Sequence, residues 1–242
     1  AIDAAVSAKR RQLETLDALR KAIIERAVTY GIAAHPKLRQ VDNEWLKEVP
    51  THWEVCRVKR VLTRMDYGIS VSTIEEGRYP VLKMGHLQDG EIRFSNLDFV
   101  DEVDDNLILE TGDLLYNRTN SPDQVGKTAV FRQSRTDAIT FASYLVRLRV
   151  NHRANAWFLN YVFNSDGFLG FARRLAIPSV QQSNLNSTRY SRMFIPLPPV
   201  REQETIRAYL DEKTGEMTRI VADIESQIAT LTAYRKSLIH EC

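Results

Sequence analysis

Residues 201–242 read REQETIRAYLDEKTGEMTRIVADIESQIATLTAYRKSLIHEC, and a heptad repeat runs along this segment. Two series of positions alternate at steps of four and three residues. One series holds Leu210, Met217, Ile224, Leu231 and Leu238, and the other holds Ile206, Lys213, Ile220, Gln227 and Tyr234. A sustained period of 3.5 residues predicts a long helix that packs along a partner helix. Gly215 argues against it, because a glycine inside a helix costs about 1 kcal/mol relative to alanine.

Residues 1–30 repeat the same pattern. Seven residues recur at one constant offset: Gln12, Thr15, Leu16, Ala18, Arg20, Lys21 and Ile24 reappear as Gln227, Thr230, Leu231, Ala233, Arg235, Lys236 and Ile239. The match includes polar residues and preserves the heptad phase, which indicates two copies of one helix. Amphipathic helices that simply pack on a core are the alternative interpretation of this spacing.

We expect the two helices to pair antiparallel as a coiled coil, because the segment between them must bring the chain back to its starting point. The seam of this pair is predicted from heptad positions in both copies. It comprises Leu16, Leu19 and Ile23 in the first helix and Ile224, Leu231, Tyr234 and Leu238 in the second. Such a pair would hold the intervening segment at one end.

The segment between the helices has the pattern of one mixed domain. Short strands are predicted at residues 79–82, 92–94, 114–116, 128–131 and 144–150, with Asp89-Gly90 as a hairpin turn. Helical stretches follow at residues 156–163 and 168–175, and their aromatic side chains are expected in the core. Residues 195–199, IPLPP, predict an extended, stiff connector to the last helix.

The predicted fold class is therefore α+β, with one mixed globular domain flanked by two long helices. The divisions are an N-terminal helix at residues 1–34, a polar linker at 35–44, the globular domain at 45–198 and a C-terminal helix at 199–242. Trp45 and Trp53, at the entrance of the domain, are expected to be buried.

The composition is that of an ordinary globular protein, with a formal net charge of +2. Cys56 and Cys242 lie far apart and form no metal-binding pair, which favours a reducing, cytoplasmic location. No apolar run approaches the roughly 20 residues that span a bilayer, and no signal peptide is recognisable, so no membrane partner is expected. The first residue is alanine, which leaves open a processed start and a cut from a longer protein.

The common motifs of catalysis are missing from the sequence. It has no glycine-rich nucleotide loop and no His-Glu-x-x-His pair. Seven acidic residues lie between Asp98 and Asp113, but no lysine or arginine accompanies them, so a solvated loop is expected rather than a nuclease centre. Pro198-Pro199 lacks the flanking residues of an amino-methylating enzyme. The chain is therefore predicted to be non-catalytic, with no metal site and no cofactor.

The charge of the middle segment is unevenly distributed. Residues 45–195 contain 19 Lys and Arg against 17 Asp and Glu, and seven of those acids lie within 98–113, which leaves ten elsewhere. Outside the acidic run the domain is therefore expected to present a basic surface. Arginine predominates there, and its planar fork of donors suits phosphate and guanine.

Two polar segments combine this charge with amides and hydroxyls: residues 116–127, YNRTNSPDQVGK, and residues 178–189, PSVQQSNLNSTR. Asn, Gln and Arg are the side chains that bind base edges with paired hydrogen bonds. Arg118, expected after a strand with its tip exposed, is the first candidate for reading a base, and Lys127 for a phosphate. A solvated or phosphate-binding role is the alternative for Arg118. The candidate DNA-binding residues are Asn117, Arg118, Asn120, Ser121, Lys127, Ser179, Gln181, Gln182, Asn184 and Arg189.

Five short segments, spread over nearly the whole chain, have a characteristic order and spacing. They are residues 46–54 (LKEVPTHWE), 112–115 (GDLL), 182–186 (QSNLN), 195–206 (IPLPPVREQETI) and 234–239 (YRKSLI). Together they resemble the specificity subunits of Type I restriction-modification systems. The resemblance implies a target recognition domain that reads one half of a bipartite DNA site, with long helices in an antiparallel coiled coil.

Whole subunits of that family carry two such domains and two such helices, whereas this chain has both helices and one domain. The resemblance therefore implies a half subunit, which could form a homodimer, or a C-terminal portion. The partners that it implies are double-stranded DNA, modification (methyltransferase) subunits and, through them, restriction subunits. S-adenosylmethionine, ATP and magnesium are implied only in those partner subunits.

The function predicted from the sequence is thus non-catalytic, sequence-specific DNA recognition within a Type I restriction-modification complex. The alternative is a coiled-coil adaptor whose central domain binds protein. DNA binding that weakens steeply with added salt would favour the first, because contacts to phosphates release counterions.

Overall fold

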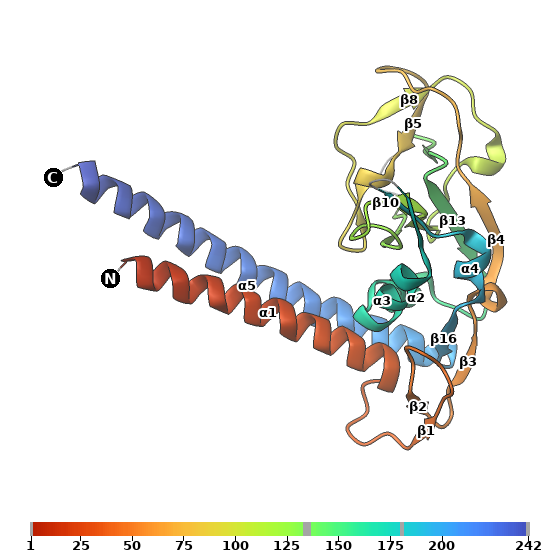
Figure 1. Ribbon diagram of the computed structural model, residues 1–242, viewed down its shortest axis with the longest axis horizontal. Coiled ribbons are helices and arrows are strands. Elements are labelled where there is room, and N and C mark those ends of the chain that lie inside the picture. The colour runs from red at the N-terminus through yellow and green to blue at the C-terminus, as the bar shows by residue number, and fades with distance from the viewer. Residues whose placement is uncertain (1, 133–136, 180–181, 241–242) are drawn as a thin grey trace.

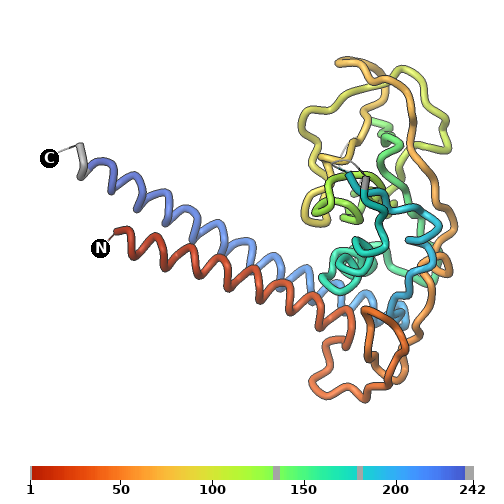
Figure 2. Tube along the Cα trace, viewed as in Figure 1, coloured from red at the N-terminus to blue at the C-terminus, as the bar shows by residue number. Residues whose placement is uncertain are grey.

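The computed structural model describes residues 2–132, 137–179 and 182–240, and the side chains of Ser179 and residues 238–240 lie outside this description. A mixed domain carries a long arm formed by α1 (Ile2–Tyr30) and the distal part of α5 (Val200–His240) (Figure 1). The start of α1 and the end of α5 lie together at the far tip of the arm (Figure 2). The predicted α+β architecture with a long helix at each end is therefore confirmed.

The helices α1 and α5 lie side by side and run antiparallel. Near the tip of the arm, Arg235 of α5 forms an ion pair with Asp3 of α1, with 3.2 Å between Nη1 and Oδ1. At the other end α1 stops at Gly31, whose φ of 76° is the left-handed conformation that glycine adopts most readily. The domain thus returns the chain to its starting point.

One series of the α5 heptad is buried as predicted. Leu210, Met217 and Ile224 are 0%, 9% and 7% exposed. The side chain of Leu238 lies outside the described residues. The predicted seam residues that are half-buried are Leu16, Ile23 and Leu231.

The second series of the predicted seam is buried at Ile206 and is displaced by one residue further along α5. Ile220 and Tyr234 are 46% and 57% exposed, and Leu19 of α1 is 48% exposed. After Leu210, a second seam position can follow at three residues (Lys213, Ile220, Gln227) or at four (Thr214, Val221, Ile228). The heptad period is the same for both series and does not choose between them. The chain buries or half-buries the other series: Thr214, Val221 and Ile228. Leu19 and Tyr234 are equivalent positions of the repeat, so the two copies expose the same position.

A four-stranded antiparallel sheet forms the middle of the domain in the order β11-β9-β13-β4. Side chains alternate between its faces, so Leu114 and Tyr116 join the core beneath the helices, whereas Leu115 joins a second core on the opposite face. The strands and the helices beside them are β4 (Leu62–Tyr67), β9 (Leu114–Asn117), β11 (Thr128–Val130), β13 (Leu145–Val150), α2 (Ala156–Asn164) and α3 (Asp166–Leu175).

The second core lies under a smaller sheet of order β12-β5-β8, in which β12 (Thr140–Phe141) runs parallel to β5 (Tyr79–Leu82) and β8 (Asp98–Val100) runs antiparallel to it. Beside it, β6 (Leu87–Gln88) and β7 (Glu91–Ile92) form the predicted hairpin. Asp89 and Gly90 make its turn with φ of 53° and 80°. Short 3-10 turns are η2 (Met84–His86) and η3 (Asp105–Leu107).

The base of the domain corrects two sequence predictions. The stretch 35–44, predicted as a linker, contains β1 (Leu38–Gln40), which pairs with β2 (Glu48–Pro50). The predicted connector 195–199 is largely β16 (Phe194–Leu197), paired with β3 (Glu54–Arg57), which leads into η1 (Val58–Val61). Pro196 is accommodated because a two-stranded sheet leaves one side of each strand without a hydrogen-bonding partner.

The aromatic side chains of α2 and α3 lie in the core, as predicted. Phe158 and Phe168 are fully buried, and Trp157 and Tyr161 pack against them while half-buried. At the domain entrance Trp53 is buried and Trp45 is half-buried. These aromatic rings therefore stabilise the fold and do not form a stacking platform for bases.

The start of α5 is fixed by Gln203, whose side chain is completely buried. Its Oε1 accepts a hydrogen bond from the Asn155 N–H at 2.7 Å, and Asn155 itself caps α2. Its Nε2 donates to the carbonyls of Arg153 and Pro198 at 3.0 and 2.8 Å. One amide thus ties α5, α2 and the end of β16 together.

The neighbouring Glu202 ties the same helix to the domain entrance. Its Oε1 accepts a hydrogen bond from Trp53 Nε1 at 3.0 Å, and its Oε2 lies 2.8 Å from His52 Nε2. The end of α1 also reaches this point, because Gly31 lies against the Trp53 ring. The arm therefore joins the domain through polar groups in the first turn of α5.

We predict that Gln203→Ala destabilises the protein by about 2–4 kcal/mol, because three backbone groups lose a buried hydrogen-bond partner. Urea unfolding followed by circular dichroism measures the change. Gln227→Ala, an exposed glutamine of the same helix, is the matched control and should be nearly neutral. Equal unfolding midpoints for the two variants would show that the buried amide does not stabilise the junction.

Contact between the arm helices is tested by two substitutions of the same kind. Ile224→Asp should destabilise the protein by about 2 kcal/mol or more, because it places a charge in a buried contact. Ile220→Asp is the control, because it makes the same Ile-to-Asp change in helix propensity at an exposed position of the same helix. Thermal unfolding monitored by helical circular dichroism distinguishes them, and equal melting temperatures would contradict the observed seam.

Candidate nucleic-acid interface

The two polar segments singled out in the sequence meet in one small sheet. β10 (Thr119–Asn120) pairs with β15 (Gln182–Asn184), which pairs with β14 (Ile177–Ser179). Asn184 Nδ2 donates to Thr119 Oγ1 at 2.9 Å, and the Leu185 N–H donates to the Arg118 carbonyl at 2.7 Å. Segments more than fifty residues apart in the sequence therefore form one surface.

This surface adjoins one end of the four-stranded sheet. β4 ends at Tyr67, β9 continues into Arg118, and β13 begins directly after Tyr144. The Arg118 N–H donates to the Tyr144 carbonyl at 3.0 Å. Lys127 reaches the same end, because its carbonyl accepts a hydrogen bond from the Asn117 N–H at 2.9 Å. Both tyrosines are exposed, and the Tyr67 ring lies against the Arg118 guanidinium.

Arg118 is held in place rather than exposed at a loop tip as expected. Its guanidinium carbon lies 5.0 Å from the centre of the Tyr67 ring, a cation–π contact. Nη1 donates to the Ser143 carbonyl at 3.3 Å, and Nε is buried without a hydrogen-bond partner among the described residues. The Tyr67 hydroxyl in turn lies 2.6 Å from Ser187 Oγ. The side chain is thus oriented by two neighbouring strands.

Asn117 is fully buried, which corrects its prediction as a DNA contact. It is the last residue of β9, and strand alternation turns its side chain inward, where Nδ2 donates to the Met84 carbonyl at 3.4 Å. The strand extends one residue further than the sequence pattern indicated. A buried asparagine here supports the sheet and does not reach a base.

Other predicted residues remain accessible at this surface. Gln182 is exposed, while Asn120, Ser121 and Asn184 are half-buried. Asn120 Oδ1 accepts the Ser121 N–H at 2.8 Å, which leaves its NH₂ group available to an acceptor. The side chain of Ser179 and all of Gln181 lie outside the described residues.

The turn between Ser121 and Lys127 is fixed from below by Arg173 of α3. The Arg173 guanidinium donates to the carbonyls of Asp123 and Val125, and its burial lowers the pKa of Arg173. Hydrogen bonds from Ser121 and Gln124 lower the pKa of Asp123, so its carboxylate is ionised. The turn therefore carries a fixed negative charge beside the surrounding amides and cations.

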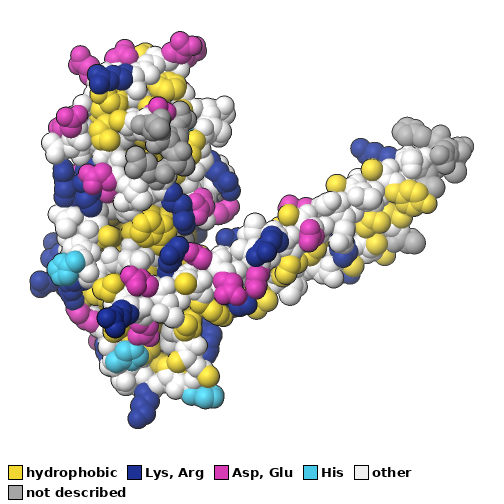
Figure 3. Space-filling model, turned by 180° about the vertical axis from the view of Figure 1, so that it is seen from behind, with side chains coloured by type: hydrophobic (Ala, Val, Ile, Leu, Met, Phe, Trp, Pro, Cys, Tyr) yellow, Lys and Arg dark blue, Asp and Glu magenta, His cyan; other side chains and the backbone are white. Residues whose placement is uncertain are grey.

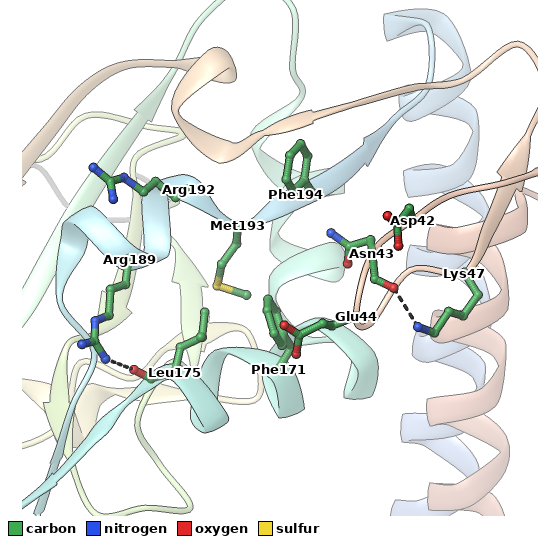
Figure 4. Close-up of a pocket in the computed structure, with 10 residues that line it drawn as sticks. All are labelled: Asp42, Asn43, Glu44, Lys47, Phe171, Leu175, Arg189, Arg192, Met193 and Phe194. Carbon is green, nitrogen blue, oxygen red and sulfur yellow. Dashed lines mark hydrogen bonds between the residues drawn. The ribbon is translucent and has the colours of Figure 1, made fainter.

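Arg189 lies apart from this surface, and its prediction as a DNA contact stays a prediction. It belongs to α4 (Ser187–Arg192), and its Nη1 donates to the Leu175 carbonyl at 3.0 Å. Figure 4 shows Arg189 and Arg192 along one side of a cavity of about 530 Å³, with Asp42 and Glu44 on the other. Arg189 therefore lines a different surface from the predicted base-reading residues.

No family model matches the chain. In sequence it is similar to the "Putative type I restriction enzyme MjaX specificity subunit" of Methanocaldococcus jannaschii, with 25% identity over 198 residues, 79% of this chain and 45% of that protein. It is also similar to the "Type I restriction enzyme EcoKI specificity subunit" of Escherichia coli, with 21% identity over 221 residues, 88% of this chain and 47% of that protein. The chain thus spans about half the length of the curated relatives it matches.

The fold points the same way. A chain in a solved structure described as the "Structural basis underlying complex assembly and conformational transition of the type I R-M system" superposes with a TM-score of 0.74 at 17% identity, over 99% of this chain and 54% of that chain. In sequence and in fold, this chain is similar to half of a Type I specificity subunit. The resemblance predicted from its short motifs is confirmed.

The acidic run at residues 98–113 is not simply the solvated loop that the sequence had predicted. Asp113 is buried, and its carboxylate accepts hydrogen bonds from Arg149 at 2.8 and 2.9 Å, which raise the pKa of Arg149. Arg147 is fully buried and donates to Asp66 at 2.7 Å. Asp98 likewise pairs with Lys83. Of the arginines counted in residues 45–195, Arg147 is therefore interior and Arg149 is half-buried, and part of the acidic run is paired.

Neither a metal centre nor a membrane span is found in the described part of this chain. Among its described residues, no group of three or more His, Cys, Asp and Glu side chains is placed to hold a metal ion. None of the helices within the described ranges combines the length and apolar character needed to cross a bilayer. The described polar surface has the residue types for hydrogen bonding and charge contacts.

Sequence reasoning missed Tyr67, Tyr144 and Arg173. Tyr67 had a usable signal, because Gly68 follows it and a Cβ at Gly68 would lie 2.1 Å from the Phe141 carbonyl oxygen. Gly68, where only a residue without a side chain fits against the Phe141 backbone, therefore marks the end of β4 at Tyr67. Tyr144 and Arg173 act through neighbours distant in the sequence, and no local pattern indicates those neighbours.

Proposed function

We propose that this chain is the DNA-recognition portion of a Type I specificity subunit and reads one half of a bipartite site. The observation that carries the proposal is the meeting of β10 and β15 beside Arg118, Tyr67, Tyr144 and Lys127. This arrangement places amides, a positioned arginine and a lysine on one surface. The similarity to two specificity subunits supports it.

The side chains at this surface suit different parts of a DNA duplex. Gln182 and Asn120 carry amides that pair with adenine, and Arg118 carries donors that pair with guanine. Lys127, a point charge, suits a phosphate. Contacts of the first kind select sequence, whereas phosphate contacts fix the position of the protein on the duplex.

The arm has a separate role in this proposal. We propose that α1 and α5 form the coiled coil of the subunit and, with 29 residues in α1, set a spacing of about 44 Å between two recognition domains. That length exceeds one turn of DNA, about 35 Å. The second recognition domain would come from the rest of a longer chain or from a second copy.

Partner subunits would dock on the same arm. Hydrophobic side chains lie along its surface in Figure 3, and Leu19, Ile220 and Tyr234 are among the exposed ones. Modification subunits, and restriction subunits through them, are the proposed partners. Methyl transfer and cleavage, with S-adenosylmethionine, ATP and magnesium, are assigned to those partners, in the cytoplasm.

The proposal is tested by selecting bound duplexes from a randomised pool, using the chain with any modification subunits that co-purify. Recovered duplexes should share a short half-site, and adenines methylated by the complex should map to it. Binding should weaken steeply with added salt. Recovery of unrelated sequences, or binding that is absent or indifferent to salt, would instead favour a coiled-coil adaptor whose domain binds protein.

Four further substitutions, at three residues, separate base reading from phosphate contact. Arg118→Ala should reduce discrimination at one base pair by about 1–3 kcal/mol, whereas Lys127→Ala should weaken binding to every sequence alike. Tyr67→Phe keeps the ring beneath Arg118 and should preserve discrimination, while Tyr67→Ala should reduce it. Binding to the selected site and to its single-base variants measures these effects. If Arg118→Ala lowers affinity equally on all duplexes, Arg118 does not read a base.

A further inference from the structure

A group of basic side chains lies beside the candidate interface on the side of the domain away from the arm. It comprises Arg57 at the end of β3, Lys59 and Arg60 of η1, and Arg189 and Arg192 of α4, and we name it the basic strip. All five side chains are exposed. β3 and α4 lie on this side in Figure 1, and Figure 3 shows Lys and Arg side chains gathered along that edge.

Two cavities connect the members of the basic strip. One of about 450 Å³ is lined by Arg57, Lys59 and Arg60, and the cavity of Figure 4 is lined by Arg189 and Arg192. Phe194 lines both cavities, and the Arg57 guanidinium lies 5.4 Å from the centre of its ring. In addition, α4 packs directly against η1. The strip is therefore one continuous surface.

Few ion pairs neutralise the charge of the basic strip within the described part of the chain. Glu54 is the acidic residue of the first cavity, and it is already paired with Arg153 at 2.5 Å. Within the described ranges of the chain, Lys59, Arg60 and Arg192 make no ion pair. In Figure 4, Arg189 and Arg192 point away from Asp42 and Glu44 across the second cavity. The side of the first cavity formed by Arg57, Lys59 and Arg60 therefore carries positive charge, which attracts anions, whereas Asp42 and Glu44 line the far side of the second cavity.

The strip begins next to the predicted base-reading residues. α4 starts three residues after Asn184 of β15, and its Ser187 lies 2.6 Å from the Tyr67 hydroxyl at that interface. The six residues of α4 rise about 9 Å, which matches two to three phosphates of one strand at about 3.4 Å each. A duplex in contact with β10 and β15 therefore has its flanking backbone within reach of α4 and η1.

We propose that the basic strip binds the sugar–phosphate backbone of duplex DNA next to the bases read by β10 and β15. This inference rests on the proposed function and adds the partner of a surface outside the base-reading residues. Five exposed cations along one edge, with Glu54 of the first cavity already paired with Arg153, favour a polyanion over the mixed charges of a protein surface. The contacts position the domain and carry no sequence preference.

The test variant combines Lys59→Gln, Arg60→Gln and Arg192→Gln. It leaves Arg57 on the Phe194 ring and Arg189 on the Leu175 carbonyl, so the local packing is kept. A matched control combines Arg10→Gln, Arg26→Gln and Arg93→Gln, three exposed arginines elsewhere that cause the same change in net charge. A third variant, Lys59→Arg, Arg60→Lys and Arg192→Lys, keeps every charge.

Binding of each full-length variant to the selected duplex and to a scrambled duplex is measured over a range of salt concentrations. The neutral strip variant should reduce the slope of log affinity against log salt by about 2.7, at about 0.9 for each of three lost phosphate contacts. The reduction should be the same on both duplexes. The charge-keeping variant and the distant control should retain the wild-type slope.

Each of the other outcomes contradicts either the strip inference or the proposed sequence-specific recognition. If the strip variant has the slope of the distant control, the strip does not bind phosphates. If DNA binding is unchanged but co-purifying modification subunits are lost, the strip docks protein. If the wild type binds both duplexes equally while the strip variant still loses slope, the strip inference stands and sequence-specific recognition fails. Absence of wild-type binding overturns both.

Discussion

The buried amide of Gln203 is the constraint on which the relation between domain and arm depends. It satisfies an N–H at the start of α2 and two carbonyls, one of them at the end of β16, so α5 can leave the domain in one direction only. The 41 residues of α5 form a lever of about 60 Å, and a tilt of about 5° at its base would move the tip by about 5 Å. A spacer between two recognition domains requires a junction that does not bend. Glu202, bonded to Trp53, adds a second attachment within the same turn.

At the far end of the domain the recognition residues are oriented before any ligand arrives. The Tyr67 ring and the Ser143 carbonyl fix the Arg118 guanidinium, and Arg173 fixes the turn that follows β10. A long side chain that is already ordered loses less conformational entropy on binding, so more of its interaction free energy contributes to affinity. The buried Nε of Arg118, which has no partner among the described residues, is the energetic cost of that arrangement.

Local pattern in the sequence predicted the elements well and their tertiary relations poorly. The heptad identified both long helices and the Leu210 series, because the 3.5-residue period is visible in each helix's own sequence, whichever helix it packs against. It could not choose between Ile220 and Val221, since both follow Met217 at a helical spacing. Asn117 was misassigned because one additional strand residue reverses the face to which a side chain points. Composition singled out both polar segments, but their pairing through β10 and β15 depends on contacts across more than fifty residues.

The buried ion pairs change how the charge of the domain must be understood. Arg147 and Arg149 seemed available to DNA when acids and bases were merely counted, yet Asp66 and Asp113 neutralise them inside the sheet. Removing these pairs from the surface count leaves a smaller set of cations, and four of these lie on η1 and α4: Lys59, Arg60, Arg189 and Arg192. At physiological salt a charge is screened beyond about 8–10 Å, so a polyanion responds to that local set and not to the net charge of +2. A nearly neutral chain can therefore still attract a polyanion to one edge, because Lys59, Arg60 and Arg192 lie there without an ion-pair partner among the described residues.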